Sequence, residues 1–592
     1  MNTAIEKNVT EVPVYGSPVT PQVDATELKD TISPKAPSVY VEDEESKPVN
    51  STAPAGVRKM EAITLVWTKP WMIAAYAFIW LIFFTDSLQQ QSNYSWTPYV
   101  TSSFYLHGLT AITGVVANIV GGISKLPLAR FIDVVGRPQG FLLMLVFVVL
   151  SLVLMGVCQN VQTYAAAQVF YWTGMNGIAY VMNIFIADTS SMKNRAILFA
   201  FTTTPYISNT FAGPALGQAF LDHSTWRWGY GAFAIITPAM CVPFWTIFVI
   251  MMRRAKGQEI IVKEKSGRTA PQSIIFWLVE FDVVGLLLIC GGFSLLLLPF
   301  SLAAYQGEGW KSPMIISMIV FGFVLLATFA VWEKYLAPKT FFPFYLLANR
   351  SVVGACLLGG NLWISFYSYK MYFGSYLQVV FQLSVSKAGY ITNIFNIVSC
   401  TWGPIIAIAA RKTDGFKWAL LAAFPVQVLM TGLMIDFRQP NTEIALLVMV
   451  EVFGAMCGAM FVMGEQLAAM NAVPHENVAV SLALLSMITS LGGSIGMAIS
   501  GAIWTQNLPG KIEHYLPADM KNETANIYAS LVTQLSYEWD SQVRQAIVSA
   551  YGDTQKLMVI TGLVTLLPCI IWILMIKNFK LSEHKQNGGL VL

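Results

Sequence analysis

Charged residues are scarce in this sequence. Only 12% of its 592 residues are Asp, Glu, Lys or Arg, whereas about 25% is usual for a soluble domain. Because so little charge leaves too few polar groups to cover a chain of this length in water, a soluble protein is excluded. The formal net charge of +3 does not indicate nucleic-acid binding, since the lysines and arginines are spread along the chain.

Other absences narrow the class further. The seven cysteines lie singly in separate apolar segments, which argues against a disulfide framework or a zinc site. No GxxxxGK(S/T) phosphate loop occurs, which argues against an ATP-driven pump. Residues 1–60 lack the apolar core of a signal peptide. Their Pro, Ser, Thr and acidic content predicts a disordered cytoplasmic tail over 1–70.

Long apolar runs dominate the rest of the chain. About fourteen segments have roughly the 20 residues that a helix needs to cross a bilayer. Within lipid every backbone amide must bond inside its own segment, so these runs form helices. The sequence therefore predicts an all-α membrane protein with about 14 transmembrane helices. The predicted spans cover residues 71–88, 106–126, 139–158, 164–186, 197–220, 230–252, 280–301, 313–333, 352–378, 389–410, 417–436, 443–468, 478–503 and 557–577.

Lysine and arginine gather on one side of the predicted spans, with a cluster from Arg253 to Arg268. This bias places both termini and these connections in the cytoplasm. The outer connections hold only Arg227, Lys311, Lys387 and Arg438.

Two N-glycosylation sequons, at Asn93 and Asn522, then face outside and are candidate glycosylation sites. Two more, at Asn8 and Asn50, fall in the inner tail. A sequon alone is therefore weak evidence for a glycan.

A short internal repeat suggests duplication. Ala129-Arg130-x-x-Asp133 follows the second span, and Ala410-Arg411-x-x-Asp414 follows the tenth. This fits two six-helix halves with two extra helices between them, although a match this short also arises by chance. The predicted units are a tail over 1–70, a first half over 71–252, a cytoplasmic loop with two extra helices over 253–351, a second half over 352–577 and a cytoplasmic tail over 578–592. Aromatic and apolar periodicity in the outer loop 504–556 predicts packed helices over an outer vestibule.

The connection over residues 129–138 resembles the motif between the second and third helices of the major facilitator superfamily, with Ala129 where a glycine is usual. The resemblance implies that Arg130, Asp133, Gly136 and Arg137 form a cytoplasmic gate. The alternative is a tight turn rich in positive charge.

In the fifth span, Gly213-Pro214-Ala215-Leu216-Gly217 resembles the Gly-Pro motif of the antiporter branches. Small residues let helices approach closely, so Gly213, Pro214 and Gly217 are candidate motif residues, with a simple packing kink as the alternative. Residues 226–230 and 280–285 resemble the fourteen-helix branch. Residues 170–174 lack the buried arginine of drug–proton antiporters, which places the proton coupling of that group in doubt here.

Three stretches, 94–107, 372–380 and 550–557, together with the long outer loop, resemble the fungal siderophore–iron transporter family. The resemblance covers about residues 65–580 and is greatest to carriers of triacetylfusarinine-type hydroxamates. It implies a non-enzymatic carrier that imports an intact ferric siderophore with protons, by alternating access across the plasma membrane. Cycling through endosomal vesicles is the alternative to permanent residence at the plasma membrane. The implied partners are the siderophore, protons and the lipid bilayer, without nucleic acid and without a cofactor or metal site, because iron travels only inside its chelate.

A coordinatively saturated ferric chelate needs aromatic faces and hydrogen-bonding side chains rather than metal ligands. Residues of these kinds gather in the first, ninth and tenth spans. An aromatic belt at the membrane surface would explain about half of them. The candidate substrate-binding residues are Gln89, Gln90, Tyr94, Trp96, Tyr99, Lys370, Tyr372, Tyr376, Gln378, Asn393, Asn396 and Trp402.

Ionisable residues inside membrane spans are costly and point to function. Asp86, Glu451 and Glu465 are candidate proton-coupling residues, with Lys370 as a counter-charge, and each acid could instead be a structural hydrogen-bonding group. The histidines His107, His223 and His514 are expected at the outer surface.

Three other functions fit the same scaffold. A drug–proton antiporter would export lipophilic compounds, and the direction of transport is not encoded in these patterns. A non-transporting nutrient receptor usually carries a longer cytoplasmic extension. A glutathione–proton exchanger would need more cations in its cleft.

Overall fold

The computed structural model describes residues 67–125, 127–128, 131, 136–189, 192–257, 269–339, 342–474 and 477–579. Predictions for the N-terminal tail up to residue 66, for most of the basic cluster between Arg253 and Arg268, for Arg130 and Asp133, and for residues 580–592 lie outside this part.

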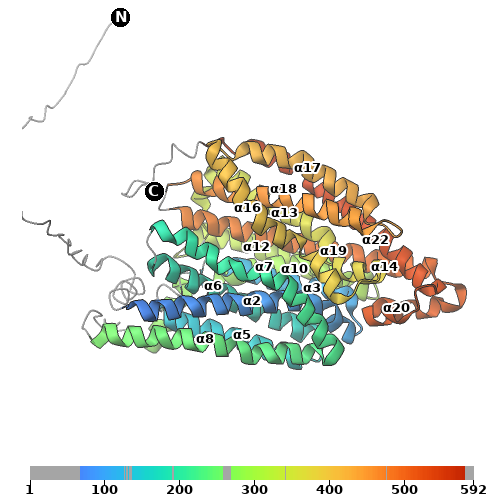
Figure 1. Cartoon of the computed structure of the whole chain (residues 1–592), viewed down its shortest axis with the longest axis horizontal. Helices are drawn as coiled ribbons and strands as arrows, with labels where there is room; N and C mark the ends of the chain where they lie inside the picture. Colours follow the sequence, from blue (N-terminus) through green and yellow to red (C-terminus); the bar gives the residue numbers. More distant parts are fainter. Residues whose placement is uncertain are drawn as a thin grey trace, which may run out of the picture. The chain divides into compact units, whose positions relative to one another are not determined.

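The helices of the first group lie together in the lower part of Figure 1, and all of them except α3 contribute to one apolar core. Helix α2 lies against α7 and α8, α5 against α6 and α8, and α3 against α6. Pro70 and Pro138 lie in the first turns of α2 and α5, where the missing N–H costs no helical hydrogen bond. The helices are α2 (Lys69–Ser103), α3 (Thr110–Ile123), α5 (Arg137–Val157), α6 (Val161–Thr189), α7 (Met192–His223) and α8 (Trp226–Gly257).

Two helices, α10 (Val283–Leu297) and α12 (Pro313–Val331), pair with each other between the two groups in sequence. Asp282 caps α10 by accepting from Gly285 N, and it also accepts from Trp332 Nε1. This carboxylate thus fixes the start of α10 next to the end of α12. The shorter elements around them are α9 (Ala270–Glu280), α11 (Pro299–Leu302), η2 (Ala303–Tyr305), η3 (Gly309–Lys311), the π-helix η4 (Trp332–Leu336) and η5 (Phe344–Ala348).

The second group is built around α13 and α19, which pack along each other and along α22. Asn349 starts α13 by accepting from Ser351 N, and Ser541 starts α22 by accepting from Arg544 N, as side-chain caps do. The helices are α13 (Arg350–Lys370), α14 (Phe373–Phe381), α15 (Val385–Thr392), α16 (Ile394–Lys412), α17 (Lys417–Phe437), α18 (Ile444–Asn471), α19 (Val478–Tyr515), α22 (Gln542–Leu566) and α23 (Cys569–Met575).

The long outer connection is shorter than predicted, because α19 continues to Tyr515 and α22 begins at Gln542. Between them lie the 3-10 helix η7 (Ala518–Glu523), α20 (Thr524–Ala529) and α21 (Leu531–Ser536), at one end of the bundle (Figure 1). Helix α20 contacts the 3-10 helix η1 (His107–Leu109), which precedes α3. Ile527 and Leu531 are buried in an apolar core shared with α14 and α22. Leu531 N also donates to Ser102 Oγ of α2, so this segment contacts both helix groups.

Eleven of the described helices are long and apolar enough to cross a membrane. The three other predicted spans are also helical: 106–126 forms the short α3, and α6 and α7 are long helices with more polar residues. The protein is thus an all-helical, multi-pass membrane protein, and the number fourteen stays a prediction.

The two outer sequons differ sharply in accessibility. Asn93 lies inside α2 with 5% of its surface exposed, and its Oδ1 accepts from Tyr230, Tyr164 and Gln168. This corrects the expectation of a glycan at Asn93, because a buried amide cannot meet the transferase. Asn522 is exposed in η7.

We therefore expect any N-linked glycan among these two sites on Asn522 alone. Thr524→Ala, which destroys that sequon and keeps the asparagine, should abolish the endoglycosidase-sensitive shift in gel mobility. Ser95→Ala, which destroys the Asn93 sequon in the same way, should leave the shift unchanged. Loss of the shift in Ser95→Ala but not in Thr524→Ala would contradict the burial of Asn93.

Candidate functional site

A cavity of about 440 Å³ lies between the two helix groups. Its wall comes from α2, α3 and α6 on one side and from α13, α14, α15, α16 and α19 on the other. A cavity of this size is in the range of small-molecule sites. Its position between the two groups is where a carrier with two rocking halves binds its solute.

Five predicted binding residues line this cavity: Tyr94, Lys370, Gln378, Asn393 and Asn396. They come from α2, α13, α14 and the junction of α15 with α16, so helices distant in sequence bring them together. A sixth candidate, Tyr99, lies beside them, because its hydroxyl donates to Gln378 Oε1 at 2.5 Å.

The other predicted residues pack elsewhere. Trp96 is buried among Tyr230 and Phe220 and donates from Nε1 to Gly217 O at 3.0 Å. Tyr372 stacks on Trp504 with ring centroids 4.0 Å apart. These aromatic side chains hold helices together away from the cavity wall. Gln89, Gln90, Tyr376 and Trp402 are likewise absent from the wall, with Gln89 and Tyr376 fully covered by neighbouring helices.

Several wall residues were not predicted. The asparagine and glutamine residues inside the apolar runs of α3 and α6 could have indicated this wall from the sequence, because a side-chain amide is costly in lipid. The unpredicted polar and aromatic wall residues include Asn118, Lys125, Gln168, Trp172, Asn176, Trp363, Phe366, Tyr367, Phe395 and Ser490.

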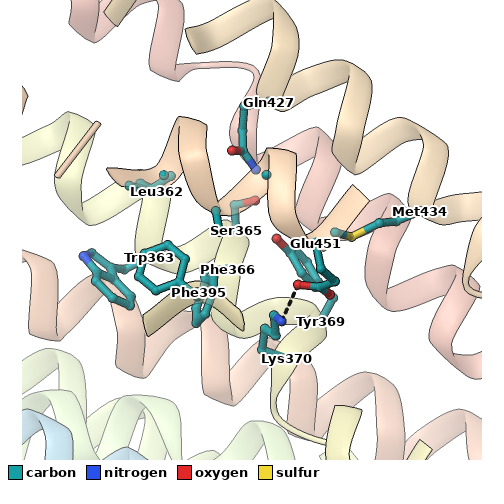
Figure 2. Close-up of a pocket in the computed structure, with 13 residues that line it drawn as sticks. Leu362, Trp363, Ser365, Phe366, Tyr369, Lys370, Phe395, Gln427, Met434 and Glu451 are labelled. Carbon is teal, nitrogen blue, oxygen red and sulfur yellow. Dashed lines mark hydrogen bonds and ion pairs between the residues drawn. The ribbon is translucent and has the colours of Figure 1, made fainter. Parts of the chain in front are cut away.

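Glu451 of α18 is the centre of a buried charge cluster beside the cavity. Its Oε2 lies 2.6 Å from Lys370 Nζ, a contact that Figure 2 shows. Its Oε1 lies 3.1 Å from an Arg438 nitrogen. Lys370 also reaches the cavity wall, so a change in the charge of Glu451 would act directly on a group that faces the solute.

Arg438 was predicted in an outer connection, and in the structure it directly follows α17. Its side chain is 0% exposed at the end of α17. The guanidinium donates to Tyr369 O and Gln555 Oε1 and lies over the Phe373 ring at 3.8 Å. Arg438 follows α17 and pairs with Glu451 of the next helix, α18, so its buried charge has a partner inside the protein.

Asp86 of α2 has a different environment. It accepts from Gln90 at 2.9 Å, Tyr171 at 3.2 Å and Tyr206 at 3.4 Å, and it does not line the cavity. Three neutral donors satisfy the carboxylate, which fits the structural alternative as well as the coupling one.

Glu465 lies further along α18, buried beside Gly359 of α13 and Thr489 of α19. A methyl group at Gly359 would come within 2.5 Å of Glu465 Oε2, so the glycine makes room for the carboxylate. Glu465 is not part of the cavity wall.

The predicted surface position of His107 is corrected by the structure. Its side chain is 0% exposed, and its ring lies edge-on to both Tyr372 and Trp504. His223 and His514 are exposed, as expected.

The helix-5 motif lies where α7 meets α2. Ser92 Oγ donates to Gly213 O, and Gly217 packs against Ser95. Pro214 reaches across to the second helix group, so close to Gly389 of α15 that a methyl group there would be 2.5 Å from Pro214 Cβ. The motif therefore serves close packing, within one group and between the two.

For the gate motif, the structure describes Gly136 and Arg137. Gly136 has φ 112° just before α5, a conformation that glycine adopts without strain. Arg137, the first residue of α5, is buried. Arg130 and Asp133 lie outside the described residues, so their gating role stays a prediction.

The outer ends of the two groups touch at several points. Besides the bond between Tyr99 and Gln378, Ser386 N in the first turn of α15 donates to Gln218 Oε1 of α7 at 3.1 Å. Tyr372 donates to Gly108 O at 2.7 Å. Opening the cavity toward this end requires these hydrogen bonds to break.

Two helix groups with a polar and aromatic cavity between them define a membrane transporter. The solved structures with this fold include a bacterial homologue of the human lysosomal transporter Spinster in an inward-facing, unoccupied conformation. It has a TM-score of 0.55 at 14% identity, covering 88% of this chain and 100% of the other. A likeness at this identity concerns the fold alone.

The chain belongs to the Major Facilitator Superfamily, whose family model matches residues 79–375, and within it to the fungal siderophore–iron transporters. "MFS siderochrome iron transporter 1" of Ajellomyces capsulatus is 46% identical over 560 residues, which are 94% of this chain and 95% of that protein. "Siderophore iron transporter mirB" of Emericella nidulans is 40% identical, over 90% of this chain and 89% of its own length. The family is one of transporters, and the resemblance that the sequence predicted is confirmed.

Proposed function

We propose that the protein imports intact ferric siderophores of the hydroxamate class, with triacetylfusarinine C as the leading candidate, by proton-coupled alternating access across the plasma membrane. The observation that carries the proposal is the cavity wall, which combines amide side chains with aromatic rings. Gln378, Asn393 and Asn396 offer hydrogen bonds, while Trp363 and Phe366 offer flat apolar faces.

This wall suits the chemistry of a ferric trihydroxamate. Its iron already has six oxygen ligands, so recognition falls to the amide, ester and hydrocarbon parts of the chelate. Iron then crosses only inside its chelate, and the carrier needs no cofactor. The printed names of the relatives, siderochrome and siderophore iron transporters, support this substrate class.

Proton coupling is proposed for Glu451. Protonation would remove the only negative charge between Lys370 and Arg438 in the described cluster and release Lys370 toward the cavity. A solute bound at the wall would therefore favour one protonation state, and such linkage couples two gradients. Asp86 and Glu465 are the other candidate carriers.

The test is uptake into proteoliposomes of a ferric trihydroxamate labelled on both iron and ligand. We expect both labels to accumulate in a constant ratio when the outside is acidic, and accumulation to stop when a protonophore collapses the gradient. Empty liposomes given the same pulse are the control for leakage.

Two results would overturn the proposal. Entry of iron without the ligand would show that the chelate is not carried intact. Absence of chelate accumulation, together with acid-driven loss of preloaded lipophilic cations or glutathione, would assign the protein as a drug–proton antiporter or a glutathione exchanger.

A further inference from the structure

Positive charge is concentrated at the central cavity. Lys125 and Lys370 both line it, and none of the described residues in its wall is aspartate or glutamate. Lys125 Nζ donates to Ser486 Oγ of α19 at 2.8 Å. That hydroxyl is neutral, so this partner satisfies a hydrogen bond of Lys125 without balancing its charge.

The second lysine belongs to a cluster that is also positive overall. Glu451 balances either Lys370 or Arg438 but not both, since two cations share one carboxylate. Asp86 is a buried acid of the first group, and it lies behind the wall rather than in it. Glu465 is a second buried acid outside the wall, so Lys125 and Lys370 are the charged side chains that the described wall presents to a solute.

Charges in such a place act strongly on a solute. Protein walls of low dielectric constant screen them weakly, and a cleft lined by one sign of charge attracts or repels solutes accordingly. A chelate with free ammonium groups would bring cations to a wall that already carries them. An amide or hydroxyl at the same position would bond to the wall amides instead.

We propose that Lys125 and the Lys370–Glu451–Arg438 cluster select ferric chelates by charge. The inference rests on the proposed function and names the substrate class of the same cavity. Neutral or anionic ferric trihydroxamates are accepted, whereas trihydroxamates with free primary amines are rejected, and Lys125 is a specificity-determining residue.

The test compares one ferric trihydroxamate that carries free amines with the same chelate after N-acetylation, so that size and iron coordination stay nearly constant. In proteoliposomes under an acid-outside gradient, we expect the N-acetylated chelate to enter at least about tenfold faster, as like charges at a binding surface suppress wrong partners. Quenching of protein tryptophan fluorescence by each chelate provides a second measurement that does not need turnover, since Trp172 and Trp363 line the cavity.

Three variants separate charge from structure. Lys125→Gln removes the charge and retains a hydrogen-bond donor toward Ser486, and it should lower the ratio of the two uptake rates and of the two affinities. Lys125→Arg keeps the charge and should keep both ratios. Lys311→Gln removes an exposed lysine of η3, outside the cavity wall, and should also keep both ratios.

The outcomes distinguish this inference from the function on which it rests. Equal uptake and equal binding of the two chelates, or ratios unchanged in Lys125→Gln, would overturn charge selection and leave siderophore import standing. Uptake and binding of neither chelate would overturn both.

Discussion

Glu451→Gln is expected to destabilise the protein by about 3–5 kcal/mol, because it leaves two buried cations without their carboxylate. Lys370 and Arg438 are 6% and 0% exposed, so water cannot replace the lost charge. The apparent midpoint of thermal unfolding in detergent should fall by several degrees or more.

A matched control lies immediately before the same helix. Glu443 precedes α18, is exposed and makes no side-chain cap, so Glu443→Gln should leave the midpoint unchanged. If the midpoint of Glu451→Gln equalled that of the unsubstituted protein, the cluster would not hold the charges that its geometry indicates.

A double-mutant cycle tests the pairing itself. Lys370→Met leaves Glu451 bonded to Arg438 and should cost less than Glu451→Gln. Combining the two substitutions should cost less than the sum of the single effects, with a coupling of about 0.5–3 kcal/mol. Strict additivity would mean that the 2.6 Å contact between Lys370 and Glu451 contributes nothing measurable.

Glu451→Gln also separates proton coupling from chelate binding. If Glu451 carries the proton, folded Glu451→Gln should still exchange chelate across vesicles at equal pH and should fail to concentrate it under an acid-outside gradient. Retained accumulation would move the proton-carrying role to Asp86 or Glu465.

The membrane-spanning helices were predictable from sequence, but their ends were not. Hydropathy locates the part of a helix that lies in hydrocarbon, whereas backbone hydrogen bonding continues as long as the chain permits. Helix α19 therefore runs to Tyr515 and α22 begins at Gln542, through polar residues that hydropathy placed in a loop.

The ionisable residues of the site were predictable one by one, while their partnerships were not. Lys370 and Glu451 stood out as charges in apolar runs, yet only the packing of α13 against α18 brings them together. Arg438 follows an apolar run in the sequence, which does not reveal its burial, because that burial depends on how α17 and α22 pack.

Aromatic residues were the least predictable part of the site. Trp96 and Tyr94 are two positions apart on α2, and Trp96 enters the core while Tyr94 lines the cavity. Composition cannot separate these cases, because a helix that spans the bundle has core, lipid and cavity faces. Only the neighbours of each face decide the role of a tryptophan or tyrosine.

Gly492→Ala is expected to weaken the contact between α13 and α19 on which the second helix group is built. A methyl group at Gly492 would lie 2.1 Å from Gly360 O, and one at Gly496 would lie 2.5 Å from Ile364 O. Glycines four residues apart allow helix backbones to approach this closely. Both oxygens belong to the backbone of α13, so no side-chain rotation can relieve the overlap.

The helices must separate to admit the methyl group, and forced overpacking costs about 1–3 kcal/mol or more. We expect a lower midpoint of thermal unfolding and a weaker yield of monodisperse protein. Because α13 and α19 both line the cavity, the affinity for the chelate should also fall in the folded fraction.

The control residue lies on α19, as Gly492 does. Gly510 of α19 has no atom within 4 Å of the position that a methyl group would take, so Gly510→Ala should leave stability unchanged or raise it by about 0.4–1 kcal/mol through the less flexible unfolded chain. Equal midpoints for Gly492→Ala and Gly510→Ala would contradict the close approach of α13 and α19. A loss of stability confined to Gly492→Ala would be due to the contact between α13 and α19, since both substitutions add the same methyl group to the same helix.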